Sequence, residues 1–185
     1  MKSGKLFIVG IGPGNREHMS QKACDVIENA DIVAGYTTYI RIIEKSFTLK
    51  NVFVTGMRSE TERCRKALEF ALDGKTVALV SSGDAGIYGM AGLMLEVIRD
   101  SGEDVETEVV PGITSASASA ALLGAPLIHD YASISLSDLL TDADLISRRI
   151  EAAASADFVI CLYNPKSRAR TGGLATAREI ILKHR

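Results

Sequence analysis

The 185-residue sequence has no tryptophan, four prolines and three cysteines. The cysteines, Cys24, Cys64 and Cys161, lie far apart and form neither a CxxC pair nor a cysteine–histidine cluster. Such clusters supply the ligands of most protein-bound zinc ions. We therefore expect no bound metal, and reduced thiols in the core of a cytoplasmic protein.

An excess of basic charge is also missing. The 21 Lys and Arg residues are outnumbered by 23 Asp and Glu residues, which gives a net charge of −2. Proteins that bind nucleic acids through bulk electrostatics carry clustered basic charge. We therefore expect no nucleic-acid partner.

Uncharged runs are few, and one of them, Val109 to Ile128, is long enough to cross a bilayer. Its prolines, glycines and hydroxyl side chains favour a strand end, a turn and a small-residue helix instead. The apolar run near the N-terminus breaks at Gly12-Pro13-Gly14, before a signal-peptide core could form. We expect no membrane contact.

Short apolar runs alternate with helical periodicity in the first part of the chain. We expect strands at 6–9, 76–81 and 106–110, another beginning at 31–34, and helices at 20–30, 59–72 and 90–100. Ser59 and Glu62 resemble a capping box at the start of the second helix, and Gly74 ends it. Buried strands separated by helices predict an α/β fold with a largely parallel sheet.

The second part of the chain has a different composition. After Pro111 we expect helices at 114–123, 144–154 and 171–185, an alternating strand within 125–137 and an apolar strand at 158–163. The sequence therefore predicts two α/β domains, residues 1–112 and 113–185, with the ligand site in the cleft between them.

Glycine is abundant at three expected strand ends, in residues 10–14, 82–86 and 110–114. Ligands of parallel sheets bind outside the carboxyl ends of the strands. The first loop fails the dinucleotide pattern G-x-G-x-x-G because Asn15 stands where the third glycine should be. No G-x-x-x-x-G-K-[ST] motif is present either, so we expect no phosphate cradle.

These loops suit a ligand that lies directly on the main chain. Glycine has no Cβ to hold a ligand away from the peptide groups. Asp84 would add one charge-assisted hydrogen bond to a hydroxyl or ammonium group. For any one loop, a simple tight turn explains the glycines equally well.

Three segments together resemble the tetrapyrrole methylase family: VGIGPG, SSGDAGIYGMA and VVPGITSASASAALLGAPL. Within it, HDYASISLSDLLT and RRIEAAASADFVICLYNPKSRART are similar to the branch of precorrin-3B and cobalt-factor III methyltransferases. The resemblance implies transfer of a methyl group from S-adenosyl-L-methionine to ring carbon 17, with ring contraction, in cobalamin biosynthesis. It also implies a homodimer.

The resemblance implies a set of cofactor-binding residues: Pro13, Ser82, Gly83, Asp84, Ile87, Thr114, Ser115, Tyr163 and Asn164. Family members extend beyond the position that matches Arg185, so the second domain is expected to be incomplete. The cofactor is a sulfonium with a carboxylate and an ammonium group, and exposed main chain suits it better than a phosphate cradle does.

Methyl transfer needs alignment more than acid–base help, whereas ring contraction needs a proton to move. His129 is the candidate acid or base because histidine titrates near neutral pH; a local hydrogen-bonding role is the alternative. Lys166, Arg168 and Arg170 are candidate partners for the carboxylates of a tetrapyrrole, with or without cobalt. They could equally form a solvated loop.

Two other functions are compatible with the sequence. A relative of the same fold could methylate another acceptor, such as another precorrin, ribosomal RNA or a diphthamide precursor. A shortened chain could also bind ligand without turnover.

Overall fold

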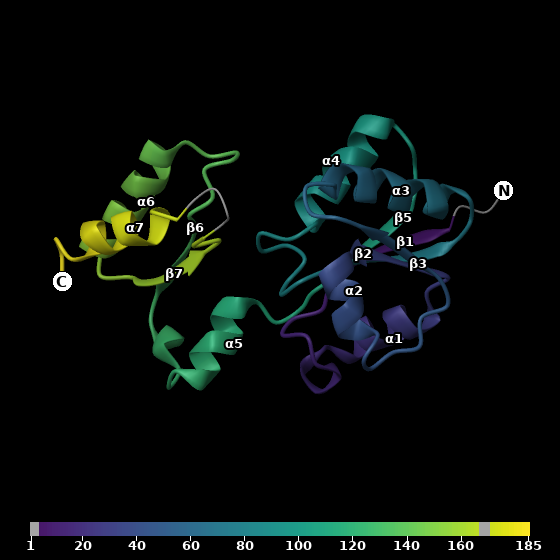
Figure 1. Cartoon of the computed structure of the whole chain (residues 1–185), viewed down its shortest axis with the longest axis horizontal. Helices are drawn as coiled ribbons and strands as arrows, with labels where there is room; N and C mark the ends of the chain where they lie inside the picture. Colours follow the sequence, from purple (N-terminus) through teal and green to yellow (C-terminus); the bar gives the residue numbers. More distant parts are fainter. Residues whose placement is uncertain (1–3, 167–170) are drawn as a thin grey trace. The chain divides into compact units, whose positions relative to one another are not determined.

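The computed structural model describes residues 4–166 and 171–185, which form two compact units, Met1–Ala118 and Ser119–Arg185. The sequence predicts a boundary after Gly112, whereas the two units divide between Ala118 and Ser119, within helix α5 (Ser115–Leu122). Both units are α/β, as predicted (Figure 1).

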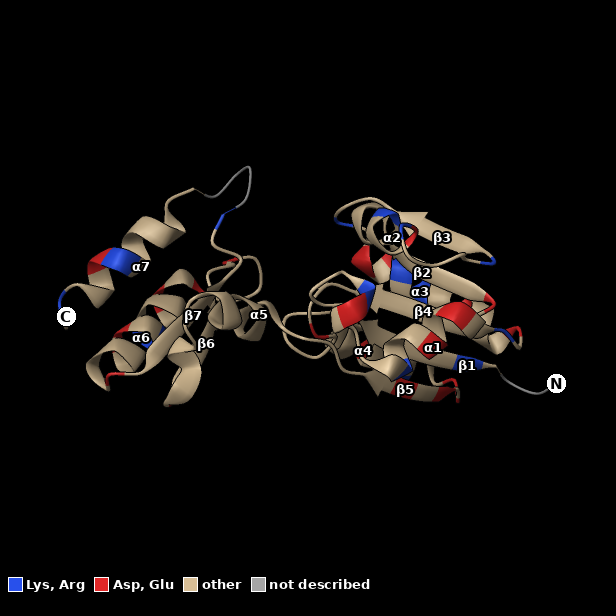
Figure 2. Ribbon diagram, turned by 90° about the horizontal axis from the view of Figure 1, so that it is seen from below, with Lys and Arg blue, Asp and Glu red and all other residues tan. Residues whose placement is uncertain are grey.

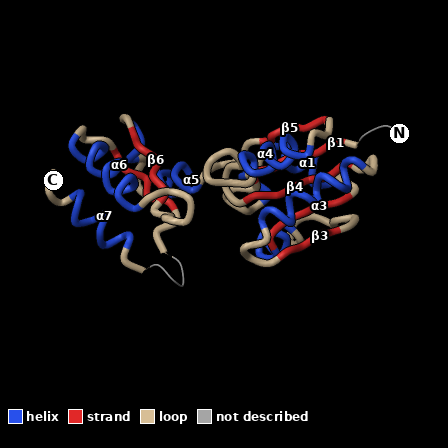
Figure 3. The backbone as a smooth tube through the Cα atoms, turned by 90° about the horizontal axis from the view of Figure 1, so that it is seen from above, coloured by secondary structure: helices blue, strands red, loops and turns tan. Residues whose placement is uncertain are grey.

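Unit 1 is built on a five-stranded parallel sheet in the order β3-β2-β4-β1-β5. The strands are β1 (Lys5–Gly10), β2 (Ile32–Tyr36), β3 (Val52–Thr55), β4 (Thr76–Ser81) and β5 (Glu106–Val110). Figure 3 shows β5, β1, β4 and β3 following one another across the sheet. The strands predicted at 76–81 and 106–110 are confirmed residue for residue.

Helices cover both faces of this sheet (Figure 1). They are α1 (Gln21–Asn29), α2 (Thr37–Ile43), α3 (Glu60–Leu72) and α4 (Ala91–Ser101). Side chains of a strand alternate between faces: Phe7 and Val9 pack with α1 and α2, whereas Leu6 and Ile8 pack with α3 and α4. The central strands β1 and β4 are apolar along most of their length because both of their faces are buried.

β3 and α2 were not predicted from the sequence. β3 is a short edge strand in which Val52 and Val54 are exposed. It has four residues, and its apolar run, Val52 to Val54, is too short to indicate a strand from the sequence pattern. α2 has seven residues, of which Ile40 and Ile43 are buried, too few for a clear helical period.

The N-terminal caps of α1 and α3 differ. Ser20 caps α1 by accepting a hydrogen bond from the Ala23 N–H at 3.2 Å. The capping box predicted at Ser59 is wrong, because the Ser59 side chain makes no capping hydrogen bond. Glu60 instead accepts one from the Arg58 N–H at 3.4 Å.

Unit 2 contains the parallel strands β6 (Tyr131–Ser135) and β7 (Val159–Tyr163), with α6 (Ala143–Ser155) and α7 (Gly173–Ile181). Ile134 and Leu162 pack against these helices. The Cys161 side chain points to the face of the sheet opposite that of Leu162 and is half-buried. The prediction of a core thiol is therefore wrong for Cys161, whereas Cys24 and Cys64 are buried.

In the residues that the structure describes, no helix is long and apolar enough to span a bilayer. In the same residues, no group of His, Cys, Asp and Glu side chains is arranged to hold a metal ion.

Candidate functional site at the carboxyl edge of the unit 1 sheet

The three glycine-rich loops follow strands that are neighbours in the sheet. β1 lies between β4 and β5, and Gly10 is in register with Ser81 of β4, while Val9 is in register with Val110 of β5. Because the strands are parallel, all three loops leave the same edge of the sheet. The predicted grouping of these loops is confirmed.

Hydrogen bonds between main-chain groups join the loops into one layer. The Ile11 N–H donates to the Ser81 carbonyl at 2.9 Å, and the Gly12 N–H donates to the Gly83 carbonyl at 2.9 Å. The Ile113 N–H donates to the Gly12 carbonyl at 3.3 Å. Some of the main-chain N–H and C=O groups that were expected to bind a ligand therefore form hydrogen bonds between the loops instead.

Glycine is needed here because the loops pack directly on one another. A Cβ added to Gly10 would lie 2.7 Å from both the Gly112 nitrogen and the Gly83 oxygen. A Cβ added to Gly112 would lie 2.7 Å from the Gly10 carbonyl carbon. These contacts are closer than real Cβ atoms approach. The idea that glycine makes room for a ligand is wrong for Gly10 and Gly112.

Asp84 connects two of the loops. Its Oδ1 accepts a hydrogen bond from the Gly86 N–H at 2.7 Å, and its Oδ2 accepts one from the Gly112 N–H at 3.0 Å. Each carboxylate oxygen can accept a further hydrogen bond. Asp84 therefore holds the β4 and β5 loops together and also places a negative charge beside them.

The other predicted cofactor residues of unit 1 differ in exposure. Pro13, Ser82, Ile87 and Ser115 are exposed, Gly83 is half-buried and Thr114 is buried. Residues 10–14, 82–89 and 111–115 contain no Lys or Arg, and Asp84 is their one charged residue. This donor set suits a neutral or cationic ligand better than a phosphate.

Tyr39 of α2 also lies beside the loops. Ser82 Oγ donates to Tyr39 Oη at 2.9 Å, and the Tyr39 ring packs edge-on against Tyr36, with the ring centroids 5.3 Å apart. Tyr39 was not predicted as a site residue because α2 was not predicted. The i, i+3 spacing of Ile40 and Ile43 was the available signal.

In unit 2, Tyr163 and Asn164 lie at the carboxyl end of the two-stranded sheet. Asn164 Nδ2 donates to Ser135 Oγ at 2.9 Å, and the Leu136 N–H donates to the Tyr163 carbonyl at 2.8 Å. These bonds fix the chain where both strands end.

Of the candidate catalytic and substrate residues that the structure describes, Lys166 lies near this end of the sheet and His129 does not. His129 is exposed and precedes β6, at the end of that strand opposite Ser135 and Asn164. Lys166 is exposed and follows Asn164 closely. Arg168 and Arg170 lie outside the described residues.

Curated relatives match nearly the whole chain. It is 52% identical over 176 residues to a probable cobalt-factor III C(17)-methyltransferase of Salmonella typhimurium, covering 95% of this chain and 73% of that protein. It is 50% identical to the cobalt-factor III methyltransferase of Priestia megaterium, covering 98% of this chain but 34% of that longer protein.

Solved structures give the same result for the fold. The crystal structure of the methyltransferase CobJ matches 99% of this chain and 77% of that chain, with a TM-score of 0.89 and 32% identity. Uroporphyrin-III C-methyltransferase from Thermus thermophilus, complexed with S-adenosyl homocysteine, matches 71% of this chain and 59% of that chain, with a TM-score of 0.58 and 30% identity.

The family model for tetrapyrrole (corrin/porphyrin) methylases matches residues 5–185. This span includes all three glycine-rich loops and both units. The fold, the loops at the carboxyl edge and the similarity to curated relatives agree: the chain belongs to the tetrapyrrole methylase family.

Proposed function

We propose that this chain is an S-adenosyl-L-methionine-dependent C-methyltransferase that acts on ring carbon 17 of cobalt-factor III in cobalamin biosynthesis. The observation that carries the proposal is the 52% identity to a probable cobalt-factor III C(17)-methyltransferase, over 95% of this chain. Precorrin-3B is the metal-free alternative acceptor, and ring contraction accompanies the methyl transfer in this proposal.

The loops at the carboxyl edge fit the proposed cofactor chemically. The cofactor would supply a methyl group on a positively charged sulfur. The three loops present one carboxylate, Asp84, and no cationic side chain. A net negative loop set attracts a cationic ligand and does not favour a polyphosphate. The complex of the Thermus thermophilus relative with S-adenosyl homocysteine supports the same cofactor class.

The three loops would together contribute several kinds of contact. Ile87 and Pro13 offer exposed apolar surface, while Ser82 and Ser115 offer exposed hydroxyl groups. The main chain of Gly83 and Thr114 and the Asp84 carboxylate would complete the unit 1 contribution. Tyr163 and Asn164 remain predicted cofactor contacts. The main catalytic effect expected of these residues is alignment of the methyl group with the acceptor carbon.

The acceptor carries several carboxylates, for which Lys166, Arg168 and Arg170 are the proposed partners. Arg side chains bind carboxylates through two parallel hydrogen bonds. His129 is the proposed acid or base for ring contraction. Its exposure leaves it accessible to solvent protons.

Calorimetric titration with S-adenosylhomocysteine tests the cofactor assignment. Ile87 is 39% exposed, so Ile87→Ala removes apolar surface from the loop without opening the core. We expect the variant to bind about tenfold more weakly, because burial of one such side chain contributes about 1.5–3 kcal/mol. Leu95→Ala is the matched control: Leu95 is 48% exposed in α4. Its affinity should equal that of the wild type.

The wild-type chain failing to bind S-adenosylhomocysteine would contradict the cofactor assignment. Mass spectrometry of cobalt-factor III incubated with the chain and S-adenosylmethionine tests the acceptor: one added methyl group is expected. Methylation of precorrin-3B alone would contradict the cobalt-containing acceptor.

The expected homodimer, cytoplasmic location and absence of a nucleic-acid partner remain proposals. The net charge of −2 supports the last of these. In Figure 2, basic and acidic segments are interspersed over unit 1.

A further inference from the structure

Arg63 is a buried cation in α3. Its side chain belongs to a residue that is only 3% exposed. A long cationic side chain is rarely buried so fully unless it is paired with an anion. Its neighbours Cys64 and Ala67 belong to the apolar core beneath α3.

The guanidinium of Arg63 contacts three neutral groups. Its Nε donates to Thr55 Oγ1 at 2.8 Å, and one terminal nitrogen (Nη2) donates to the Gly56 carbonyl at 3.1 Å. The other terminal nitrogen (Nη1) contacts Met90 Sδ at 3.7 Å. Within the described residues, none of these partners is a carboxylate, and Arg63 forms no ion pair.

These contacts join two loops that follow different strands. Thr55 ends β3, and Gly56 follows it. Met90 immediately precedes α4, and its N–H donates to the hydroxyl of Ser81, the last residue of β4, at 3.3 Å. The guanidinium group of Arg63 therefore contacts both the β3 loop and the end of the β4–α4 loop.

The β4–α4 loop is residues 82–89, which carry Ser82, Gly83, Asp84 and Ile87. Its far end is fixed at Met90 and by the Ala91 N–H, which donates to the Ala85 carbonyl at 2.9 Å. Burying a guanidinium without a counter-charge costs stability. An apolar side chain would fill the same space without that cost, so a buried guanidinium at this position points to a role in geometry.

We propose that Arg63 is a positioning residue for the cofactor site: the hydrogen bonds of its guanidinium group fix the β4–α4 loop relative to the β3 loop. This inference rests on the proposed function where it concerns the cofactor. The effect on loop order is independent of it. Arg63 acts through Met90 and does not touch the ligand.

Two substitutions distinguish the effect of the positive charge from the effect of the several hydrogen-bond donors of the guanidinium group. Arg63→Met keeps the aliphatic stem and removes every donor. Arg63→Lys keeps the charge but has one donor group, which cannot reach Gly56 and Met90 together. Arg65→Met is the matched control, because Arg65 is exposed on the same helix.

The experiment measures amide hydrogen exchange of residues 82–90 and the affinity for S-adenosylhomocysteine. Arg63→Met should speed exchange in this segment and weaken binding about tenfold, as expected for the loss of hydrogen bonds from a charged donor. Arg63→Lys should give an intermediate result in both measurements. Arg65→Met should match the wild type.

Unchanged exchange in residues 82–90 of Arg63→Met would overturn the inference. If Arg63→Met does not fold, Arg63→Lys decides: wild-type exchange and affinity in that variant would overturn the inference. A wild-type chain that binds no S-adenosylhomocysteine would contradict the proposed function. The exchange measurement would then still decide whether Arg63 positions the loop.

Discussion

At the scale of single residues, the glycines at the carboxyl edge are set by contacts between loops. Gly10 and Gly112 face one another's main chain, and Asp84 accepts a hydrogen bond from the Gly112 N–H at 3.0 Å. A side chain at either glycine would push apart loops that hydrogen bonds hold together. The same residues would shape the proposed cofactor site.

Gly112→Ala should destabilise unit 1 because the new methyl group collides with the main chain of Gly10 and Gly83. We expect a loss of about 2–3 kcal/mol in the free energy of unfolding, as for an overpacked core. Gly92→Ala is the control, since a Cβ there has no atom within 4 Å outside its own helix. It should be neutral or stabilising by up to about 1 kcal/mol. Denaturant unfolding measures both, and equal effects would contradict the packing explanation.

Asp84 shows how far residue types predict a site. A lone carboxylate beside glycines, at the end of an apolar run, indicated a functional loop from the sequence. Its local partner, Gly86, is two residues away, as in an Asx turn. Its other partner, Gly112, could not be predicted, because it is far from Asp84 in sequence and adjacent only in the fold.

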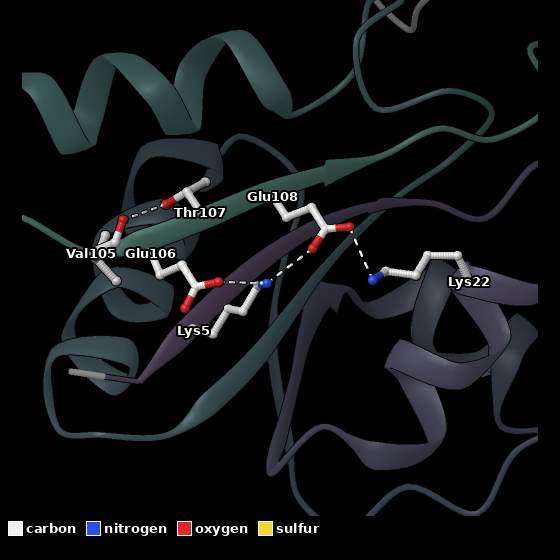
Figure 4. Close-up of polar contacts among 6 residues, drawn as sticks. All are labelled: Lys5, Lys22, Val105, Glu106, Thr107 and Glu108. Carbon is white, nitrogen blue, oxygen red and sulfur yellow. Dashed lines mark hydrogen bonds and ion pairs between the residues drawn. The ribbon is translucent and has the colours of Figure 1, made fainter. Parts of the chain in front are cut away.

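At the scale of elements, β5 is an edge strand protected by charge. Lys5 Nζ lies 2.7 Å from Glu106 Oε1 and 3.0 Å from Glu108 Oε2, and Lys22 Nζ lies 3.1 Å from Glu108 Oε1 (Figure 4). Charged side chains on an edge strand discourage pairing with another chain.

The pKa of Glu108 is lowered, first by its hydrogen bond with Lys5 and then by that with Lys22. A lowered folded-state pKa contributes stability above the unfolded-state pKa, and this contribution is lost as pH falls through the folded-state value. Glu108→Gln should therefore reduce the loss of stability on acidification below the ordinary glutamate range. Thermal unfolding at several pH values at low salt measures this effect.

Salt should weaken the effect of Glu108→Gln, because exposed ion pairs are screened. Glu103→Gln is the control, since Glu103 is exposed and forms no ion pair within the described residues. An acid profile of Glu108→Gln identical to that of the wild type would exclude the network as a source of stability.

The elements themselves were predicted unequally. β4 was found because its apolar run, Val77 to Val80, ends sharply, whereas β3 was missed because it has four residues and an apolar run of only three. Ser59 matched a capping box by spacing alone, yet its side chain does not cap α3. A local motif favours a capping hydrogen bond, but whether that bond forms depends on how the first turn of the helix packs in the fold.

At the scale of the whole molecule, the two units have separate cores. Ile8 is fully buried between the unit 1 sheet and α3 and α4, and Ile150 of α6 is buried in the core of unit 2 with β6 and α7. Each core therefore stabilises its own unit.

Ile150→Ala should destabilise unit 2 by about 2–5 kcal/mol because it leaves a cavity in a packed core. Amide exchange should accelerate in α6, β6 and β7 and stay unchanged in β1 and β4. Ile8→Ala should give the converse pattern. Uniform acceleration in both units of either variant would show that the chain unfolds as one cooperative unit.

The sequence by itself determined the α/β class, the central strands and the family, because these follow from apolar periodicity and from motifs contiguous in the chain. Only the tertiary structure decided which groups meet at the carboxyl edge. Contacts such as Asp84 with Gly112, Ser82 with Tyr39 and Arg63 with Met90 join residues far apart in sequence. The order of strands in the sheet brings them together, and that order is set by packing of both faces, which no local pattern contains.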